Sequence, residues 1–127
     1  DVKKTMFKGK RVHIFGGTKM TKLNPLDYCK AVEEKGAGEI IINSIDNDGV
    51  MQGYDLELIK EISQSVSIPV VALGGARGFS DFSDAVSKSF ASAVAAGSKF
   101  VYQGPRKAVL VNYPDKKTLN KIFKNVT

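Results

Sequence analysis

Three apolar segments of strand length recur along the chain, and each one runs into a loop rich in glycine or aspartate. The segments are EIIINSI at 39–45, IPVVAL at 68–73 and ASAVAAG at 91–97. Amphipathic helical patterns follow the first two loops, at 54–66 and 81–90. This order of strand, loop and helix predicts parallel βα units, because right-handed crossovers lay successive strands side by side with the helices outside.

Two α/β architectures fit such a repeat, an open doubly wound sheet and a (β/α)8 barrel. The barrel is favoured because the loops that could hold a ligand follow the carboxyl ends of the strands, where barrels carry their active sites. The three core strands are too few to close a barrel, and the chain opens with DVKK rather than with methionine. We therefore expect the carboxyl-terminal part of a longer chain, or a fragment that completes itself by association.

The first 22 residues are strongly basic, with six lysines and one arginine against the single acid Asp1. The segment VHIF ahead of GGT predicts an exposed β-ribbon with a glycine-rich turn. Asn24 and Pro25 are the residue types of a helix cap and of a first helical position, and Gly36 can end that helix. A helix is therefore expected between Pro25 and Gly36.

The carboxyl-terminal third contains one helix with a clear apolar stripe and a tail that is harder to interpret. In the helix at 81–90, the residues expected to face the core are Phe82, Ala85, Val86 and Phe90. Residues 108–114 have no clear secondary-structure pattern, whereas a terminal helix is predicted across 115–126.

The composition, with 43% hydrophobic and 25% charged residues in 127, indicates one soluble globular domain. A formal net charge of +6 is compatible with an anionic ligand or partner. The single cysteine, Cys29, excludes an internal disulfide framework and suits a reducing cytoplasm. No apolar stretch reaches the roughly 18 residues of a membrane span, and the basic start resembles no recognised nucleic-acid-binding module. We expect a cytoplasmic protein that binds neither membrane nor nucleic acid.

Glycines at two neighbouring strand ends predict an anion site. Gly74 and Gly75 follow one strand, and Gly97 with Ser98 follows the next. Bare backbone amides at such positions can approach a phosphate without obstruction by a Cβ atom. Ser98 would also begin a short helix, whose amino terminus favours negative charge. Each glycine alone could simply make a tight turn, but the pair on consecutive strands favours a phosphate site.

The remaining polar residues divide into candidate ligand groups and structural ones. Asp48, next to Gly49, is expected to face a ligand, whereas Asp46 is expected to cap a turn. Asp1 could act as a general acid or base if it stands at the end of a strand, although a terminal aspartate is more often solvated. His13 is expected at the surface or half-buried without a catalytic role, and Cys29 in the core.

Several of these motifs together resemble the cyclase subunit of imidazole glycerol phosphate synthase, an enzyme of histidine biosynthesis. The resemblance covers about the first 100 residues and includes GGTK, EEKGAGEIIINSIDNDGVMQGYDLELI, SIPVVALGGARG and ASAVAAGSKF. It implies that residues 1–127 form the carboxyl-terminal portion of a (β/α)8 TIM barrel, from the end of unit five to unit eight.

The resemblance also implies roles for individual residues. Asp1 corresponds to one of the two catalytic aspartates of the family, and Glu39 to a charged residue at the bottom of the barrel, where ammonia enters. The residues expected around the substrate phosphate are Asp48, Gly49, Gly74, Gly75, Gly97 and Ser98. Ammonia from a glutaminase subunit would attack a phosphorylated ribulosyl formimino-carboxamide nucleotide, with neither metal nor organic cofactor.

Two departures from the family pattern keep alternatives open. Leu73 stands where the family often has serine, and Asn43, together with the tail beyond Phe100, is more similar to paralogues from surface-polysaccharide gene clusters. Those paralogues imply glutaminase-coupled amidation of a sugar. A third reading is a non-catalytic partial barrel that retains affinity for phosphate.

Overall fold

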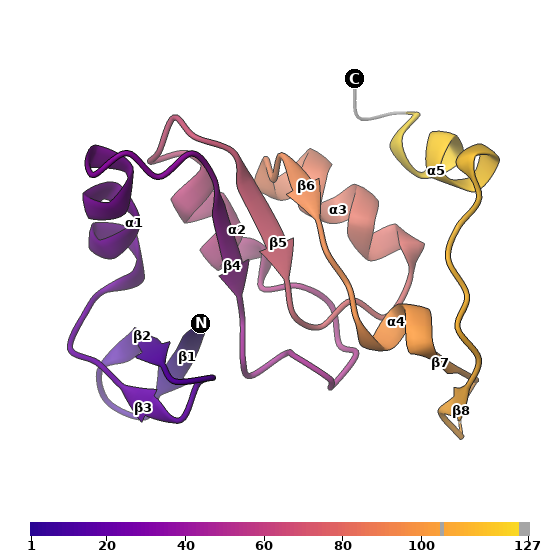
Figure 1. Ribbon diagram of the computed structural model, residues 1–127, viewed down its shortest axis with the longest axis horizontal. Coiled ribbons are helices and arrows are strands. Elements are labelled where there is room, and N and C mark those ends of the chain that lie inside the picture. Colours follow the sequence, from indigo (N-terminus) through magenta and orange to yellow (C-terminus); the bar gives the residue numbers. More distant parts are fainter. Residues whose placement is uncertain (105, 125–127) are drawn as a thin grey trace.

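The computed structural model describes residues 1–104 and 106–124, and it contains an antiparallel ribbon, a parallel sheet, a small hairpin and five helices (Figure 1). The ribbon consists of β1 (Val2–Thr5), β2 (Gly9–Ile14) and β3 (Lys19–Met20). The parallel sheet consists of β4 (Ile40–Asn43), β5 (Val70–Leu73) and β6 (Ala93–Val94). The helices are α1 (Pro25–Glu34), α2 (Leu56–Ser63), α3 (Phe79–Ser89), α4 (Ser98–Val101) and α5 (Lys116–Phe123).

The predicted parallel βα units are confirmed. Strand β4 pairs with β5 from Ile40 opposite Val70 to Asn43 opposite Leu73, and β5 pairs with β6 at Val71 and Ala93. All three strands are shorter than the apolar runs that predicted them, and β6 keeps two residues of the expected seven. The start of the chain lies beside β4, where Val2 makes a parallel bridge with Ser44.

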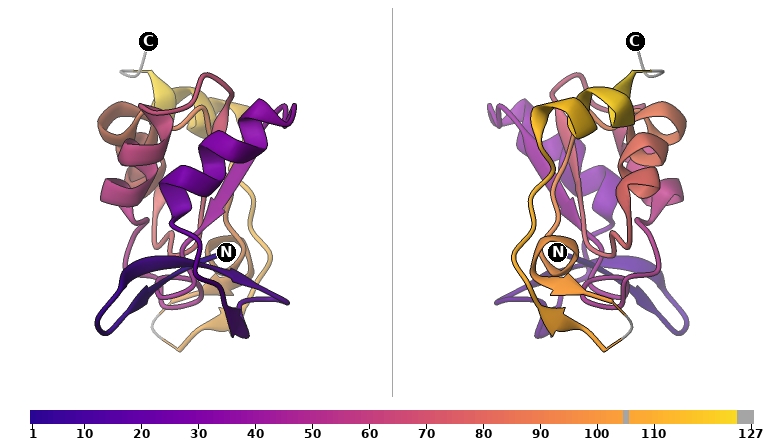
Figure 2. Two further views of the ribbon diagram at one scale, coloured as in Figure 1. Left: turned by 90° about the vertical axis from the view of Figure 1, so that its left-hand side faces the viewer. Right: turned by 90° about the vertical axis from the view of Figure 1, so that its right-hand side faces the viewer.

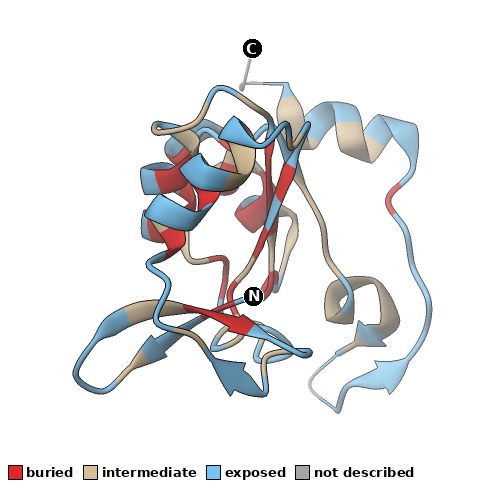
Figure 3. Ribbon diagram, turned by 60° about the vertical axis from the view of Figure 1, so that its left-hand side comes forward, coloured by how far each residue is buried: buried red, intermediate tan, exposed pale blue. Residues whose placement is uncertain are grey.

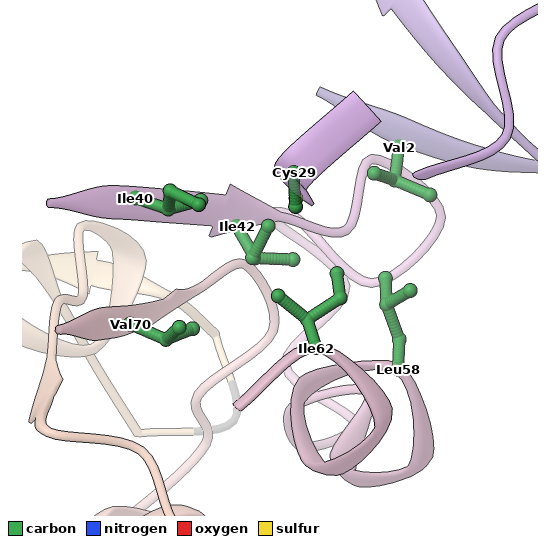
Figure 4. Packing of buried hydrophobic residues seen from close by; sticks show 7 residues of the cluster. All are labelled: Val2, Cys29, Ile40, Ile42, Leu58, Ile62 and Val70. Atoms are coloured by element: carbon green, nitrogen blue, oxygen red, sulfur yellow. The ribbon is translucent and has the colours of Figure 1, made fainter. Parts of the chain in front are cut away.

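The core lies between one face of this sheet and the helices. Ile40, Ile42 and Val70 pack against Leu58 and Ile62 of α2, as Figure 4 shows. A second cluster joins β5 to α2 and α3 through Ala72, Ile59, Phe82 and Ala85. Figure 2 shows α2 and α3 together on one side of the sheet, and in Figure 3 the buried residues gather there. The opposite face is open, because Ile41 between the two buried isoleucines is 56% exposed.

Helix α1 begins and ends at the residues that the sequence predicted. The side-chain oxygen of Asn24 accepts hydrogen bonds from the backbone amides of Leu26 (2.8 Å) and Asp27 (3.3 Å), and Pro25 occupies the first helical position. Gly36 follows the last turn with φ of 92°, a value that suits glycine. Cys29 on this helix is buried, as predicted.

Helix α3 differs from its prediction at both ends. It begins at Phe79, two residues before the expected start at 81. Phe90 was expected to face the core, and this is wrong: the residue adopts a left-handed conformation with φ of 58°, and its side chain is 53% exposed. The helix stops at Ser89, which is fully buried, so the turn that ends the helix directs Phe90 outward.

The tail has structure that its pattern did not reveal. Val109 and Ala108 form β8 (Ala108–Val109), which pairs antiparallel with β7 (Tyr102–Gln103). The predicted terminal helix is α5, while residues 125 and 126 of that prediction lie outside the described residues. Within the described parts of the chain, no helix has the length and apolar character needed to cross a membrane.

Candidate functional site

The loops that follow β4, β5 and β6 leave the same edge of the sheet and contact one another (Figure 1). The backbone amide of Gly53, in the loop after β4, donates to the carbonyl of Gly75 after β5 at 2.7 Å. The hydroxyl of Tyr54 donates to the carbonyl of Ala95 after β6 at 2.9 Å. Three segments distant in sequence are therefore held together at the carboxyl ends of the parallel strands.

All six residues predicted around a phosphate line one small hollow between these loops, which we call the glycine hollow. Its lining consists of Asp48, Gly49, Met51, Gly74, Gly75, Ala76, Ala96, Gly97 and Ser98. The hollow has a volume of about 10 Å³, which is room for about one water molecule. A phosphate group would therefore have to bind at its rim, or after the loop 46–53 moves outward.

The glycines of the hollow differ in what their backbone requires. Gly74 and Gly75 have φ of 91° and 103°, and a Cβ atom at Gly74 would lie 2.6 Å from Oδ1 of Asn43. A Cβ atom at Gly75 would collide with the carbonyl oxygen of Gly53. These two positions need glycine for the turn itself. Gly97 has a negative φ, and a Cβ atom added to it would have no neighbouring atom within 4 Å. Its backbone therefore does not require glycine.

Asp1 lies at the same edge of the sheet but outside the lining of the glycine hollow. Its backbone carbonyl accepts a hydrogen bond from the amide of His13 at 2.8 Å, which fixes the main chain. Its carboxylate Oδ1 accepts a hydrogen bond from Nδ2 of Asn43 at 3.0 Å. The side-chain oxygen Oδ1 of Asn43 lies beside Gly74, so Asn43 connects the carboxylate of Asp1 to the hollow.

The two aspartates after β4 have different surroundings. Asp48 is exposed at the rim of the hollow. Asp46 is structural, as predicted, although its partner is not in its own loop: Oδ2 accepts a hydrogen bond from the backbone amide of Lys4 in the ribbon at 2.6 Å. This bond attaches the ribbon to the loop that carries Asp48.

Two other predicted residues lie away from the hollow. Glu39 is exposed and directly precedes β4, so it lies at the opposite, amino-terminal edge of the sheet. His13 is more buried than predicted, at 8% exposure, and its Nδ1 lies 3.1 Å from the carbonyl of Arg11. That position gives His13 a structural role in the ribbon.

A buried carboxylate that sequence reasoning missed supports the loop after β5. Asp81 accepts hydrogen bonds from the backbone amide of Arg77 at 2.9 Å and from Nη2 of the same residue at 3.1 Å. Burial acts to raise the pKa of Asp81, but the hydrogen bonds and charge of Arg77 outweigh it, and the pKa lies below its ordinary value. Burial, together with the charge of Asp81, raises the pKa of the neighbouring Tyr54. The spacing of arginine and aspartate by four residues was the available sequence signal.

The ribbon supplies the positive charge near the site. Residues 1–22 hold seven of the 19 basic residues and one of the 13 acids, so the rest of the chain, with twelve of each, has no net charge. Lys10 attaches the ribbon to the start of α2 through a 2.7 Å ion pair with Asp55. The excess charge is thus concentrated on the element joined to the loop of Asp48.

Comparison with known proteins places the chain in a family. The family model described as "Histidine biosynthesis protein" matches residues 1–105. A protein of Pseudomonas aeruginosa named "Putative imidazole glycerol phosphate synthase subunit hisF2" is 45% identical over 115 residues, which are 91% of this chain and 46% of that protein. A similarly named protein of Leptospira interrogans is 44% identical over 124 residues, 97% of this chain and 49% of the relative.

A third relative, "Imidazole glycerol phosphate synthase subunit HisF" of Alkaliphilus metalliredigens, is 45% identical over 102 residues, 80% of this chain and 40% of the relative. The chain spans about half the length of the curated relatives it matches. The resemblance noted in the sequence motifs is therefore confirmed, and the chain belongs to the histidine biosynthesis protein family.

Proposed function

We propose that this chain is the carboxyl-terminal portion, from the end of unit five to unit eight, of a (β/α)8 cyclase subunit of the imidazole glycerol phosphate synthase type. The substrate would be a phosphorylated ribulosyl formimino-carboxamide nucleotide, attacked by ammonia. The observation that carries the proposal is the convergence of six candidate phosphate-binding residues on one hollow, beside an aspartate at the edge of the same sheet.

Each of these groups has a proposed role that follows from its chemistry. Backbone amides around Gly75, Gly97 and Ser98 would face a phosphate of the substrate, because small residues let the anion approach the main chain. Asp1 would transfer protons during cleavage and ring closure as one of two catalytic aspartates. The basic ribbon would attract the anionic substrate toward this edge of the sheet.

We further propose a glutaminase subunit as partner at the opposite edge, near Glu39. Glu39 lies at the amino-terminal end of β4, and the reacting groups lie at the carboxyl-terminal end, so ammonia entering there would travel along the sheet. Reduced, buried Cys29 suits the cytosol as the compartment.

The open face of the sheet needs a cover, which we propose is the other half of the barrel or a second copy of this chain. Ile41 is exposed there, and an apolar groove of about 80 Å³ runs along the free edge of β4, lined by Val2, Cys29 and Ile42 among others. A groove of about 730 Å³ lies beside β6, between Phe82, Phe100 and Phe123.

The test is to supply the nucleotide with ammonium salt to the full-length protein and to measure formation of the imidazole product. Substitution of Asp1 by alanine should lower turnover by about 10²- to 10⁴-fold, because that is the usual contribution of a positioned acid or base. Asp27→Ala is the matched control, since Asp27 is exposed on α1, away from the hollow. Unchanged turnover in the Asp1 variant would remove this residue from the mechanism.

Asn43 and Leu73 favour a second candidate, amidation of a sugar by ammonia, because both depart from the pattern of the cyclase. A folded, full-length protein that binds phosphate but forms no imidazole product would favour this candidate. A third candidate, a phosphate-binding partial barrel without catalysis, requires that the 127-residue chain itself binds inorganic phosphate saturably.

A further inference from the structure

Asn43 contacts both the candidate acid, Asp1, and the turn after β5. It is the last residue of β4 and lies opposite Leu73 of β5. Because side chains alternate along a strand, Asn43 shares a face with the exposed Ile41 and not with the buried Ile40 and Ile42. Its side chain therefore lies on the face of the sheet opposite Ile40 and Ile42, at the edge where the loops meet.

The orientation of the Asn43 amide is determined by Asp1. Nδ2 donates to Oδ1 of Asp1 at 3.0 Å, while Oδ1 of Asn43 is buried and has no hydrogen-bond partner. A buried acceptor without a partner is unfavourable. Turning the amide around would place its oxygen against the carboxylate of Asp1, which is worse because both groups are acceptors. The unpaired oxygen is thus a consequence of the bond to Asp1.

The space for this arrangement is provided by Gly74. A Cβ atom at position 74 would lie 2.6 Å from Oδ1 of Asn43 and 2.7 Å from the backbone oxygen of Ser44, so any other residue would displace the amide or the backbone beside it. Glycine at this position therefore serves both the turn and the orientation of the amide.

We propose that Asn43 is the positioning residue for Asp1, and that the contact of Asn43 with Gly74 couples the orientation of the Asp1 carboxylate to the turn of the glycine hollow. His13 fixes the backbone of Asp1, and Asn43 fixes its carboxylate. The side-chain amide of Asn43 can hydrogen-bond to the carboxyl of Asp1 in either protonation state. It donates to the carboxylate form and, once turned around, accepts from the protonated form.

This proposal rests on the proposed function in one respect, the role of Asp1 in turnover, and its first test uses the full-length protein with ammonium salt. Asn43→Leu keeps the branching of the side chain and removes the hydrogen bond. We expect kcat to fall by about 10²-fold, the effect of misplacing a reacting group, with KM changed less than twofold. In a protein that already carries Asp1→Asn, the same substitution should have no further effect.

Thermal unfolding of the variant separates positioning from folding. Asn43→Leu removes a buried, unpaired oxygen, so the melting temperature should not fall. Full kcat in the Asn43→Leu variant, or an equal loss of kcat with and without Asp1→Asn, would overturn the proposal.

A second measurement does not depend on activity. In NMR spectra of the ¹⁵N-labelled 127-residue chain, the side-chain amide protons of Asn43 should shift when Asp1 is replaced by alanine and stay in place when Asp27 is replaced. Identical Asn43 signals in both variants would refute the contact. A wild-type protein that forms no imidazole product, while this NMR shift is present, would reject the proposed reaction and leave the Asn43–Asp1 contact standing.

Discussion

Three glycines of the hollow form a graded series that tests whether each one serves the turn or a ligand. Gly75 combines a φ of 103° with a collision of any Cβ atom against backbone, Gly49 has a φ of 74° in open space, and Gly97 has neither constraint. Alanine at Gly75 therefore introduces both an unfavourable φ and a steric clash, alanine at Gly49 introduces only the unfavourable φ, and alanine at Gly97 introduces neither.

The expected losses of unfolding free energy follow from these differences. A positive φ in a residue with a Cβ atom costs about 1–2 kcal/mol, which is the whole effect expected for Gly49→Ala. Gly75→Ala adds displacement of the loop that carries Gly53, about 1–3 kcal/mol for an overpacked site, so the total is about 2–5 kcal/mol. Gly97→Ala should change stability by less than about 1 kcal/mol, and in the stabilising direction, since alanine restricts the unfolded chain.

Urea unfolding of the 127-residue chain and the three variants measures this series, with an unchanged dependence on denaturant as the check that unfolding remains comparable. Phosphate titration of the same proteins gives the second half of the test. Gly97→Ala should weaken phosphate binding without loss of stability, because its new methyl group would stand where the anion approaches. A Gly75 variant as stable as the wild type would refute the steric argument, and undiminished phosphate binding by the Gly97 variant would remove that residue from the site.

Three further outcomes are expected. Ile62→Ala should lower the free energy of unfolding by about 2–5 kcal/mol, because Ile62 is fully buried in the cluster beneath β4, and chemical denaturation measures this loss. Asp81→Asn should destabilise the chain by about 1–3 kcal/mol at pH 7. Since the pKa of Asp81 is lowered in the folded chain, this stabilisation is present above the unfolded pKa and is lost as the pH falls through the folded value, so the melting temperatures of variant and wild type should converge in acid. If the ribbon attracts an anionic substrate, kcat/KM of the full-length protein should fall as salt is added, and Lys3→Glu with Lys4→Glu should flatten that dependence, whereas a salt dependence identical to wild type would exclude the ribbon from this role.

Much of the fold was predictable from local patterns. The Asn24–Pro25 pair located the start of α1, and the β-branched run ending at Asn43 predicted a parallel strand whose loop reaches the site. The position of the six hollow residues followed from one rule, that parallel strands end at a common edge. These predictions depend on short stretches of sequence or on the direction of the strands.

The errors and omissions involve contacts between distant segments. Periodicity placed Phe90 inward, but a helix that stops one residue earlier turns that side chain outward. The bond between Asn43 and Asp1 joins residues 42 positions apart, and no local pattern indicates it. Glu33 likewise accepts hydrogen bonds from the backbone amides of Ser67 and Ile68, which attaches α1 to the start of β5. The hydrogen bonds from Ser67 and Ile68 lower the pKa of Glu33, yet its position on α1 gave no sign of them.

The exposed isoleucine in the middle of β4 has a consequence for measurements on the chain in solution. Ile41 turns an apolar side chain toward water on the face of the sheet opposite Ile40 and Ile42, and whatever covers that face binds only the folded form. By mass action, the midpoint of thermal unfolding should then rise with protein concentration if copies of the chain cover one another. In that case dilution alone would lower the stability of the folded chain, so its melting temperature would have a meaning only at a stated concentration.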